Sequence, residues 1–231
     1  SPNTNKPQHL GHMRNNVLGD SVARLLTAYG QAVVRANLIN DRGIHICKSM
    51  LAYQREGNGA TPESTGKKGD HFVGDYYVLF DQRFRAEFER HKSEHPEDAA
   101  LEKDDFLKIS EWGQAAQDLL VRWERGDTEV LALWRMMNKW VIDGFHETYT
   151  VLGIKFDRIY LESETYVQGK EIIEKGLTTG VFQKRDDGAV EIDLAAEKLG
   201  KKIVLRSDGT SVYMTQDIGT TVMKADEHGL A

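Results

Sequence analysis

Apolar residues begin to recur at helical spacing directly after a polar stretch that covers residues 1–12. Leu18, Val22, Leu25, Leu26 and Tyr29 recur at helical spacing, and Gly30 follows where a helix C-cap glycine is expected. The run 32–39 is rich in β-formers and stops at the turn-forming pair Asn40-Asp41, so it predicts a buried strand. A helix followed by a mostly apolar strand favours a parallel α/β sheet.

The middle of the chain departs from this pattern. Residues 55–71 are polar and glycine-rich and predict a loop, and helices are predicted over 75–95, over 111–125 and from an N-cap at Asp127 onward. The inward residues expected in the first and last of these helices are Tyr76, Leu79, Phe80, Phe84 and Phe88, then Val130, Trp134, Met137, Val141 and Phe145. Because this helical block separates two α/β segments, we predict that it is an insertion or an elaborated crossover.

Strand signals return after Gly153. The pattern predicts a strand over 156–161, a short helix over about 167–175, and hairpins at Asp186-Asp187-Gly188 and Ser207-Asp208-Gly209. A last strand over 211–214 is expected to lead through Thr215-Gln216-Asp217 into a new helix. We therefore expect three parts: 1–50 as the first half of an α/β domain, 51–126 as the helical insertion, and 127–231 as the remainder.

Composition narrows the class of protein further. The 231 residues are 40% hydrophobic and 29% charged with 4 prolines, which excludes a disordered, collagen-like or low-complexity chain. The single cysteine, Cys47, excludes an internal disulfide and predicts a reducing, cytoplasmic location. No apolar run reaches the roughly 20 residues that span a bilayer, so no membrane partner is expected. The net charge of −6 argues against nucleic-acid binding through bulk positive charge.

The segment His9-Leu10-Gly11-His12, just before the first helix, carries the clearest chemistry. A helix N-terminus attracts phosphate through its unpaired N–H groups and its dipole, and Gly11 lets a nucleotide approach the backbone. The imidazoles of His9 and His12 could donate hydrogen bonds to phosphate oxygens, and Lys6 adds a mobile positive charge. Two histidines at a helix start are, taken alone, more often a cap and a surface group than a catalytic pair. The surrounding proline, lysine, asparagines and glycine change this balance, because the junction is too polar to be explained by packing.

Other candidate sites have simpler explanations. The Gly59–Lys68 stretch lacks P-loop spacing, Asp186-Asp187-Gly188 lacks calcium-loop spacing, and His91 and His95 favour a solvated helix face, so no metal site is predicted. The four tryptophans lie in helical stretches and favour core packing. Asp217 permits two interpretations, a ligand-binding group at the carboxyl end of a strand or an ordinary helix N-cap.

Several segments together resemble one family. His9-Leu10-Gly11-His12 is similar to the HIGH signature of class I aminoacyl-tRNA synthetases, and Ser1-Pro2-Asn3 with Lys6-Pro7 resembles the arginyl-tRNA synthetases in particular. Further stretches agree with this resemblance: Leu18-Gly19-Asp20, Asn40-Asp41-Arg42-Gly43 and Tyr213-Met214-Thr215-Gln216-Asp217-Ile218-Gly219. The resemblance implies a Rossmann-type, HUP-like parallel-sheet catalytic domain that binds nucleotide.

The resemblance also implies a reaction and its residues. Such an enzyme makes arginyl-adenylate from ATP and L-arginine, with Mg²⁺ accompanying ATP, and transfers arginine to tRNA(Arg); we expect a monomer. Carried over by motif, the catalytic residues are Lys6, His9 and His12, and the ATP site comprises Lys6, His9, Gly11 and His12. The arginine site comprises Ser1, Asn3, His12, Tyr213 and Asp217. A carboxylate such as Asp217 suits the planar guanidinium fork of arginine.

Some features depart from the family pattern. Gln216 stands where the family usually has arginine, Arg42 where it usually has tryptophan, and the second class I signature, the KMSKS loop, is not found. Both ends of the chain look cut, so we expect a catalytic core that does not complete aminoacylation alone and whose −6 charge does not argue against tRNA. Another HxGH nucleotidylyltransferase and a non-catalytic ligand-binding fragment remain as alternatives.

Overall fold

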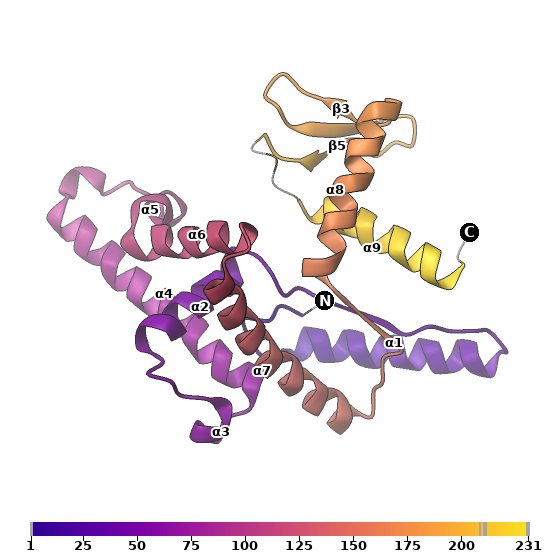
Figure 1. Cartoon of the computed structure of the whole chain (residues 1–231), viewed down its shortest axis with the longest axis horizontal. Coiled ribbons are helices and arrows are strands. Elements are labelled where there is room, and N and C mark those ends of the chain that lie inside the picture. Colours follow the sequence, from indigo (N-terminus) through magenta and orange to yellow (C-terminus); the bar gives the residue numbers. More distant parts are fainter. Residues whose placement is uncertain (1, 208, 210–211, 230–231) are drawn as a thin grey trace. The chain divides into compact units, whose positions relative to one another are not determined.

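The computed structural model describes residues 2–207, 209, 212–229, and it divides the chain into two compact units, 1–158 and 159–231 (Figure 1). Each unit has buried hydrophobic residues of its own. Among the described residues, no helix is both long and apolar enough to span a membrane. The three-part division at residues 50 and 126 stays a prediction, because compactness alone does not separate an insertion from its host domain.

Helices dominate the first unit. Their bounds are α1 Leu10–Ala28, α2 Ile44–Glu56, α3 Pro62–Thr65, α4 Gly69–Glu94, the 3₁₀ helix η1 Pro96–Asp98, α5 Lys103–Ile109, α6 Glu111–Glu124 and α7 Thr128–Leu152. Strand β1 (Ala36–Ile39) belongs to a two-stranded sheet with β2 (Arg158–Leu161), whose first residue ends the unit. Between residues 51 and 126 the structure contains helices and turns but no strand.

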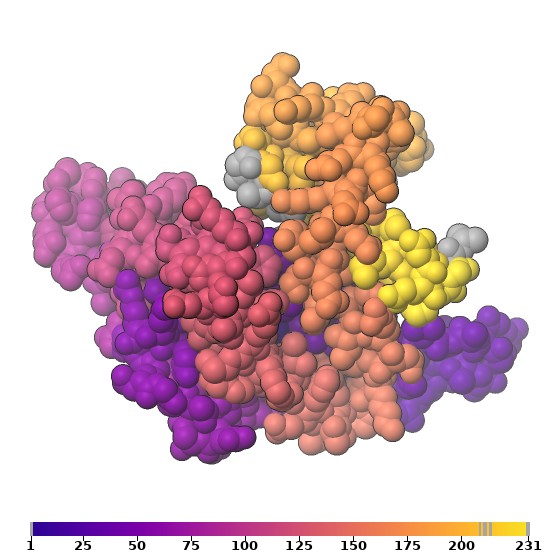
Figure 2. All heavy atoms as spheres, viewed as in Figure 1, coloured from indigo at the N-terminus to yellow at the C-terminus, as the bar shows by residue number. Residues whose placement is uncertain are grey.

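Tight packing of α2, α4, α6 and α7 forms the core of this unit. Phe80, Phe84 and Phe88 are buried along α4, and Val130, Met137, Val141 and Phe145 along α7, as the helical spacing predicts. Tyr53, Phe72, Tyr76 and Trp140 make edge-to-face ring pairs with centroids 5.2–6.2 Å apart. In the space-filling view these helices form one solid lobe (Figure 2).

Glycines allow these helices to approach each other closely. A Cβ on Gly69 of α4 would overlap the carbonyl oxygen of Trp140 in α7, and a Cβ on Gly144 would lie 2.7 Å from a carboxylate oxygen of Asp70. Asp70 is buried and accepts a hydrogen bond from Lys68 Nζ at 3.1 Å. The crossing of α4 and α7 therefore depends on residues without side chains.

Several predictions for this unit need correction. Helix α2 was not expected, although Ile46, Met50 and Leu51 recur at helical spacing and are buried. Helix α4 begins at Gly69 rather than at 75, and the short α3 interrupts the expected loop, because Thr61 and Ser64 cap each other across its first turn. The predicted strand over 32–39 is shorter, since only 36–39 pair as a strand.

Helix α1 is confirmed, but its apolar residues are not in the core. Leu18, Val22, Leu25, Leu26 and Tyr29 are all exposed, and within the helix only Ala23 is buried. The chain leaves α1 through Gly30, whose φ of 89° is the left-handed conformation that glycine adopts without strain. Helical spacing thus predicted the secondary structure correctly without predicting burial.

The second unit packs two helices against a small sheet. Its elements are α8 Glu162–Thr179, β3 Gln183–Lys184, β4 Val190–Leu194, β5 Gly200–Leu205 and α9 Tyr213–His228. The strands are antiparallel in the order β3-β4-β5. Ile173, Phe182, Val190 and Val204 form its buried core. Gly169 and Gly219 permit close contact of α8 with α9. A Cβ on Gly169 would overlap the carbonyl oxygen of Thr215 in α9, and a Cβ on Gly219 would overlap that of Thr165 in α8.

In this unit the first predicted hairpin is confirmed: Gly188, with φ 88°, turns β3 into β4, and an unpredicted turn over 195–199 joins β4 to β5. At the second predicted position Gly209 N donates to Arg206 O at 2.9 Å, so the chain turns there, but helix α9 follows instead of a strand and the turn does not make a hairpin. Residue 208 lies outside the described residues. The turn at 195–199 has the sequence Ala-Ala-Glu-Lys-Leu, which contains no residue typical of turns. Its positive φ is adopted by Lys198, where a glycine would have made the turn predictable.

The last predicted strand, over 211–214, is also wrong. Residue 211 lies outside the described residues, and Tyr213 and Met214 already belong to α9. Thr215 explains the early start, because its hydroxyl accepts a hydrogen bond from Val212 N at 3.0 Å, across the first turn. The same hydroxyl donates to the carbonyl of Val204, which ties the start of α9 to β5.

Candidate active site at the start of the first helix

The polar N-terminal segment lies beside the end of strand β1. Asn3 and Asn40 form a parallel bridge, in which Thr4 N donates to Asn40 O and Asn40 N donates to Pro2 O, both at 2.9 Å. Asn40 follows the last residue of β1, so the segment runs along the carboxyl end of that strand. Open α/β sheets bind their ligands at this edge.

His9 and His12 cap helix α1 reciprocally. His9 is the N-cap residue, and its Nδ1 accepts from Gly11 N at 3.1 Å; His12 Nδ1 accepts from His9 N at 3.2 Å. The two rings stack with centroids 3.9 Å apart and an interplanar angle of 30°. The HxGH spacing is therefore that of a capping box. The cap interpretation of the two histidines is confirmed, and the catalytic one stays a prediction.

This capping arrangement determines where each imidazole carries its proton. Because Nδ1 accepts in both rings, a neutral ring is protonated on Nε2. Within the described part of the chain, neither Nε2 has a hydrogen-bond partner. Two N–H donors on stacked rings thus remain for an anion at the start of α1, where the helix dipole also favours negative charge.

A glycine is required at position 11 because the His9 ring lies against it. A Cβ at this position would lie 2.9 Å from His9 Cε1 and 3.1 Å from His9 Nδ1. Any side chain here would displace the His9 ring from its cap position. Sequence reasoning assigned the glycine to close approach of a nucleotide, and the structure adds that it makes room for the imidazole.

The pKa of His12 lies below its usual value of 6.5, chiefly because the ring is partly buried and secondarily because of His9 and Lys6. We expect its C2 proton to titrate below pH 6.5 in NMR. Since the unfolded chain binds this proton more readily, stability from this group is complete above pH 6.5 and declines as pH falls toward the folded-state pKa. His9→Ala should move the midpoint back toward 6.5; a wild-type midpoint above 6.5 would contradict the assignment.

Comparison with known proteins identifies the family. Residues 1–229 match the family model described as tRNA synthetases class I (R), catalytic domain. The chain belongs to this family. The predicted α/β class and the resemblance to arginyl-tRNA synthetases are thereby confirmed.

Individual relatives agree with the family model. Over 224 residues the chain is 56% identical to an arginine–tRNA ligase of Bacteroides thetaiotaomicron, and it is 53% identical over 228 residues to one from Parabacteroides distasonis. These matches cover 97% and 99% of this chain but 37% of each relative. The arginyl-tRNA synthetase of Thermus thermophilus superposes with a TM-score of 0.67 at 25% identity, covering 96% of this chain and 34% of that one.

Lys6 lies in a positively charged neighbourhood of the first unit. The pKa of His45 is lowered by burial and then by Lys48 and Lys6, which places the two lysines within electrostatic reach of this ring. His45 Nδ1 is 3.1 Å from Tyr77 Oη. Pro7 packs on α4, since a Cβ on Gly74 would lie 2.8 Å from Pro7 Cδ. The loop before α1 is therefore supported by α4 as well as by β1.

The arginine-binding residues carried over from the family stay predictions. Ser1 lies outside the described residues, as does the side chain of Tyr213, although its backbone begins α9. Asp217 is exposed in the second turn of α9, so it is neither at a strand end nor an N-cap, and both sequence-based interpretations of its position are wrong. Arg42 lies 5.4 Å above the Trp123 ring and pairs with Glu124 at 3.2 Å.

One acidic position is absent from the predicted site residues. Glu162 is the first residue of α8 and directly follows β2, the place where α/β sheets present ligand-binding groups. The signal was available in the predicted strand over 156–161, whose carboxyl end is followed by this glutamate. Glu162 is therefore an additional candidate for a ligand-binding residue.

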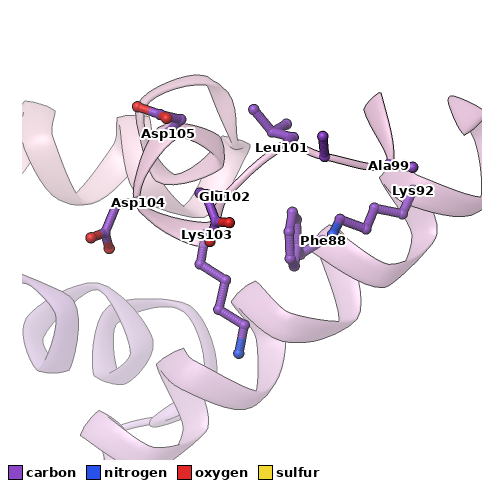
Figure 3. Close-up of a pocket in the computed structure, with 9 residues that line it drawn as sticks. Phe88, Lys92, Ala99, Leu101, Glu102, Lys103, Asp104 and Asp105 are labelled. Atoms are coloured by element: carbon purple, nitrogen blue, oxygen red, sulfur yellow. The ribbon is translucent and has the colours of Figure 1, made fainter. Parts of the chain in front are cut away.

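The other motifs do not form a second site among the described residues. His91 Nε2 is 2.8 Å from Asp98 and His95 Nδ1 is 3.2 Å from Glu97, and no group of three or more potential metal ligands occurs in the part described. A cavity of about 600 Å³ lies between α4 and the start of α5; it is lined by Phe88 and Lys92 of α4, by residues 99–102, and by Lys103, Asp104 and Asp105 of α5 (Figure 3). Its charged groups have both signs and provide no focused binding chemistry.

Proposed function

We propose that this chain is the catalytic core of an arginine–tRNA ligase. The observation that supports this most directly is the reciprocal histidine cap at the N-terminus of α1, beside the carboxyl end of β1. In the proposed reaction a carboxylate oxygen of L-arginine attacks the α-phosphorus of ATP, and the bond to the β-phosphate breaks. Pyrophosphate leaves and arginyl-adenylate forms. A ribose hydroxyl of tRNA(Arg) then attacks the arginyl carbonyl carbon, and AMP leaves.

The proposed roles follow from the chemistry of each group. The Nε2–H groups of His9 and His12, the first amides of α1 and the Lys6 ammonium would bind and stabilise the phosphates as charge develops. Gly11 keeps the His9 ring in place. Asn3, Asp217 and His12, with Ser1 and Tyr213, would bind arginine. Catalysis then rests on positioning and charge stabilisation and needs no covalent enzyme intermediate.

We further propose that Mg²⁺ enters with ATP as its phosphate complex and that the protein acts as a cytoplasmic monomer. The buried thiol of Cys47 fits a reducing compartment, because burial raises its pKa to about 12 and keeps it protonated. A lone protonated thiol has no structural need of an oxidising environment.

Ligand-dependent stability tests the substrate assignment. L-arginine is expected to raise the midpoint of thermal unfolding, whereas L-lysine should have little effect. At an arginine concentration of about 100 Kd, the free energy of unfolding should increase by about 2.7 kcal/mol. A lysine ammonium lacks the planar fork that a carboxylate pairs with bidentately. Equal stabilisation by both amino acids would favour another HxGH nucleotidylyltransferase.

Exchange of pyrophosphate into ATP tests the chemistry itself. We expect arginine-dependent exchange, measured with and without tRNA(Arg), because the forward reaction releases pyrophosphate reversibly. Arginine binding with no exchange in either condition would favour a ligand-binding fragment. The two measurements together separate the three candidate functions.

A further inference from the structure

A buried hydrogen-bond network lies directly behind the histidine cap. Gln8, the residue before His9, is 9% exposed, and its Nε2 donates to Tyr149 Oη at 2.7 Å. Asn37 in β1 donates its Nδ2 to the same phenol oxygen at 2.9 Å. Gln8 Oε1 in turn accepts from Asn16 Nδ2 in α1 at 3.3 Å. One phenol oxygen therefore joins the loop, the strand and the long helix α7.

Tyr149 itself is held rigidly. Its side chain is 4% exposed, and its ring packs edge-to-face on Phe156 with centroids 4.9 Å apart. Helix α7 ends shortly afterwards at its C-cap Gly153, and Ile154 N donates to Tyr149 O at 2.9 Å, which holds the last turn. Burial raises the pKa of the phenol, so it stays a neutral hydroxyl. A fixed acceptor thus determines where the Gln8 amide lies.

The position of Gln8 matters because the next residue is the N-cap of α1. The backbone N–H of His9 donates to His12 Nδ1, and His9 O accepts from His12 N at 2.9 Å and from Met13 N at 3.2 Å. A shift of Gln8 therefore moves the N-cap residue and both stacked rings. Small displacements of groups that contact a transferring phosphoryl group are costly, since misplacement by about 1 Å can lower a rate by about 10²-fold.

We propose that Tyr149 is a positioning residue that sets the geometry of the histidine cap through Gln8. It touches neither histidine, and its effect on the reaction passes through the loop backbone. The proposal rests on the proposed function of this site, so it needs one measurement that requires no activity and one that does.

Tyr149→Phe removes the hydroxyl while leaving the ring packing, and Tyr53→Phe is its matched control. Tyr53 Oη donates to Ala60 O at 2.9 Å and has edge-to-face ring contacts, but its hydrogen bond lies in the polar segment between α2 and α3. Hydrogen exchange is measured at the amides of Gly11, His12 and Met13. We expect these amides to exchange about 10-fold faster in Tyr149→Phe and at wild-type rates in Tyr53→Phe. Equal behaviour of the two variants would overturn the proposal.

Kinetics of arginine activation then separate positioning from simple loss of stability. In the pyrophosphate-exchange assay we expect Tyr149→Phe to lower kcat about 10- to 100-fold while KM for ATP and arginine changes less than about 3-fold. Tyr53→Phe should retain wild-type kcat. A change confined to KM, or an unchanged kcat, would overturn the proposal.

Gln8→Leu removes the same hydrogen bond from the other side and covers the case in which Tyr149→Phe folds poorly. The variant that combines Tyr149→Phe with Gln8→Leu is expected to be no slower than the slower single variant, because both changes break the same hydrogen bond. Multiplying effects would contradict a shared path through Gln8. If the wild-type protein shows no exchange at all, the proposed function fails, whereas the hydrogen-exchange comparison still decides whether Tyr149 orders the cap.

Discussion

Gly11→Ala is expected to lower the rate of arginine activation by about 10²- to 10³-fold while leaving stability nearly unchanged. The new Cβ would lie 2.9 Å from His9 Cε1, so the imidazole must leave its cap position and with it the stacked contact to His12. Loss of one preorganised donor to a developing anion has an effect of that size. Steady-state pyrophosphate exchange measures the rate, and the loss of the mutual ring-current shifts of the two histidines checks the cause.

Stability should hardly change in this variant because two terms offset each other. Loss of the N-cap interaction costs about 1 kcal/mol, and alanine is better than glycine inside a helix by about the same amount. Gly19→Ala in the same helix is the matched control, since a Cβ on Gly19 would have no atom within 4 Å of it. The control should gain up to about 1 kcal/mol and keep full activity. If the Gly11→Ala variant activates arginine at a rate within about 3-fold of the wild-type rate, the position of the His9 ring is not needed for the reaction.

Gly69→Ala, in contrast to Gly11→Ala, is expected to cause a large loss of stability. Its Cβ would overlap the carbonyl oxygen of Trp140, a backbone atom that cannot move without displacing α7. Overpacking at such a contact costs about 3 kcal/mol, which corresponds to about 10 °C in the unfolding midpoint for a chain of this size. Chemical denaturation followed by circular dichroism measures the change.

The consequences of Gly69→Ala should extend to the site. Helix α4 also carries Gly74, which packs against Pro7 of the loop before α1, so displacing α4 moves that loop. Gly19→Ala again serves as the control for replacing a helical glycine with alanine. A denaturation midpoint for Gly69→Ala equal to that of wild type would mean that α4 and α7 do not cross as closely as the structure has them.

The meeting of the two histidines at one helix start was predictable from local sequence. His9 and His12 are three residues apart, which is the spacing of a capping box, and local spacing is enough to predict that both rings meet at one helix start. The predicted position of Asp217 at the end of a strand was wrong because it depended on whether 211–214 formed a strand. Thr215 decided this through contacts with Val212 and with the carbonyl of Val204, and the second of these comes from a strand eleven residues away.

The sequence by itself determined helices α1, α6 and α7, the polar segment before α1 and the family. Periodicity and capping act over three or four residues, so a local pattern along the chain carries this information. Only the tertiary structure decided that position 69 has no room for a side chain, because the Trp140 carbonyl oxygen lies against it. It also decided that α1 exposes its apolar residues and that Gln8 is hydrogen-bonded to Tyr149, 141 positions away. These features depend on which distant backbone or side-chain atom lies opposite, and no local pattern specifies that neighbour.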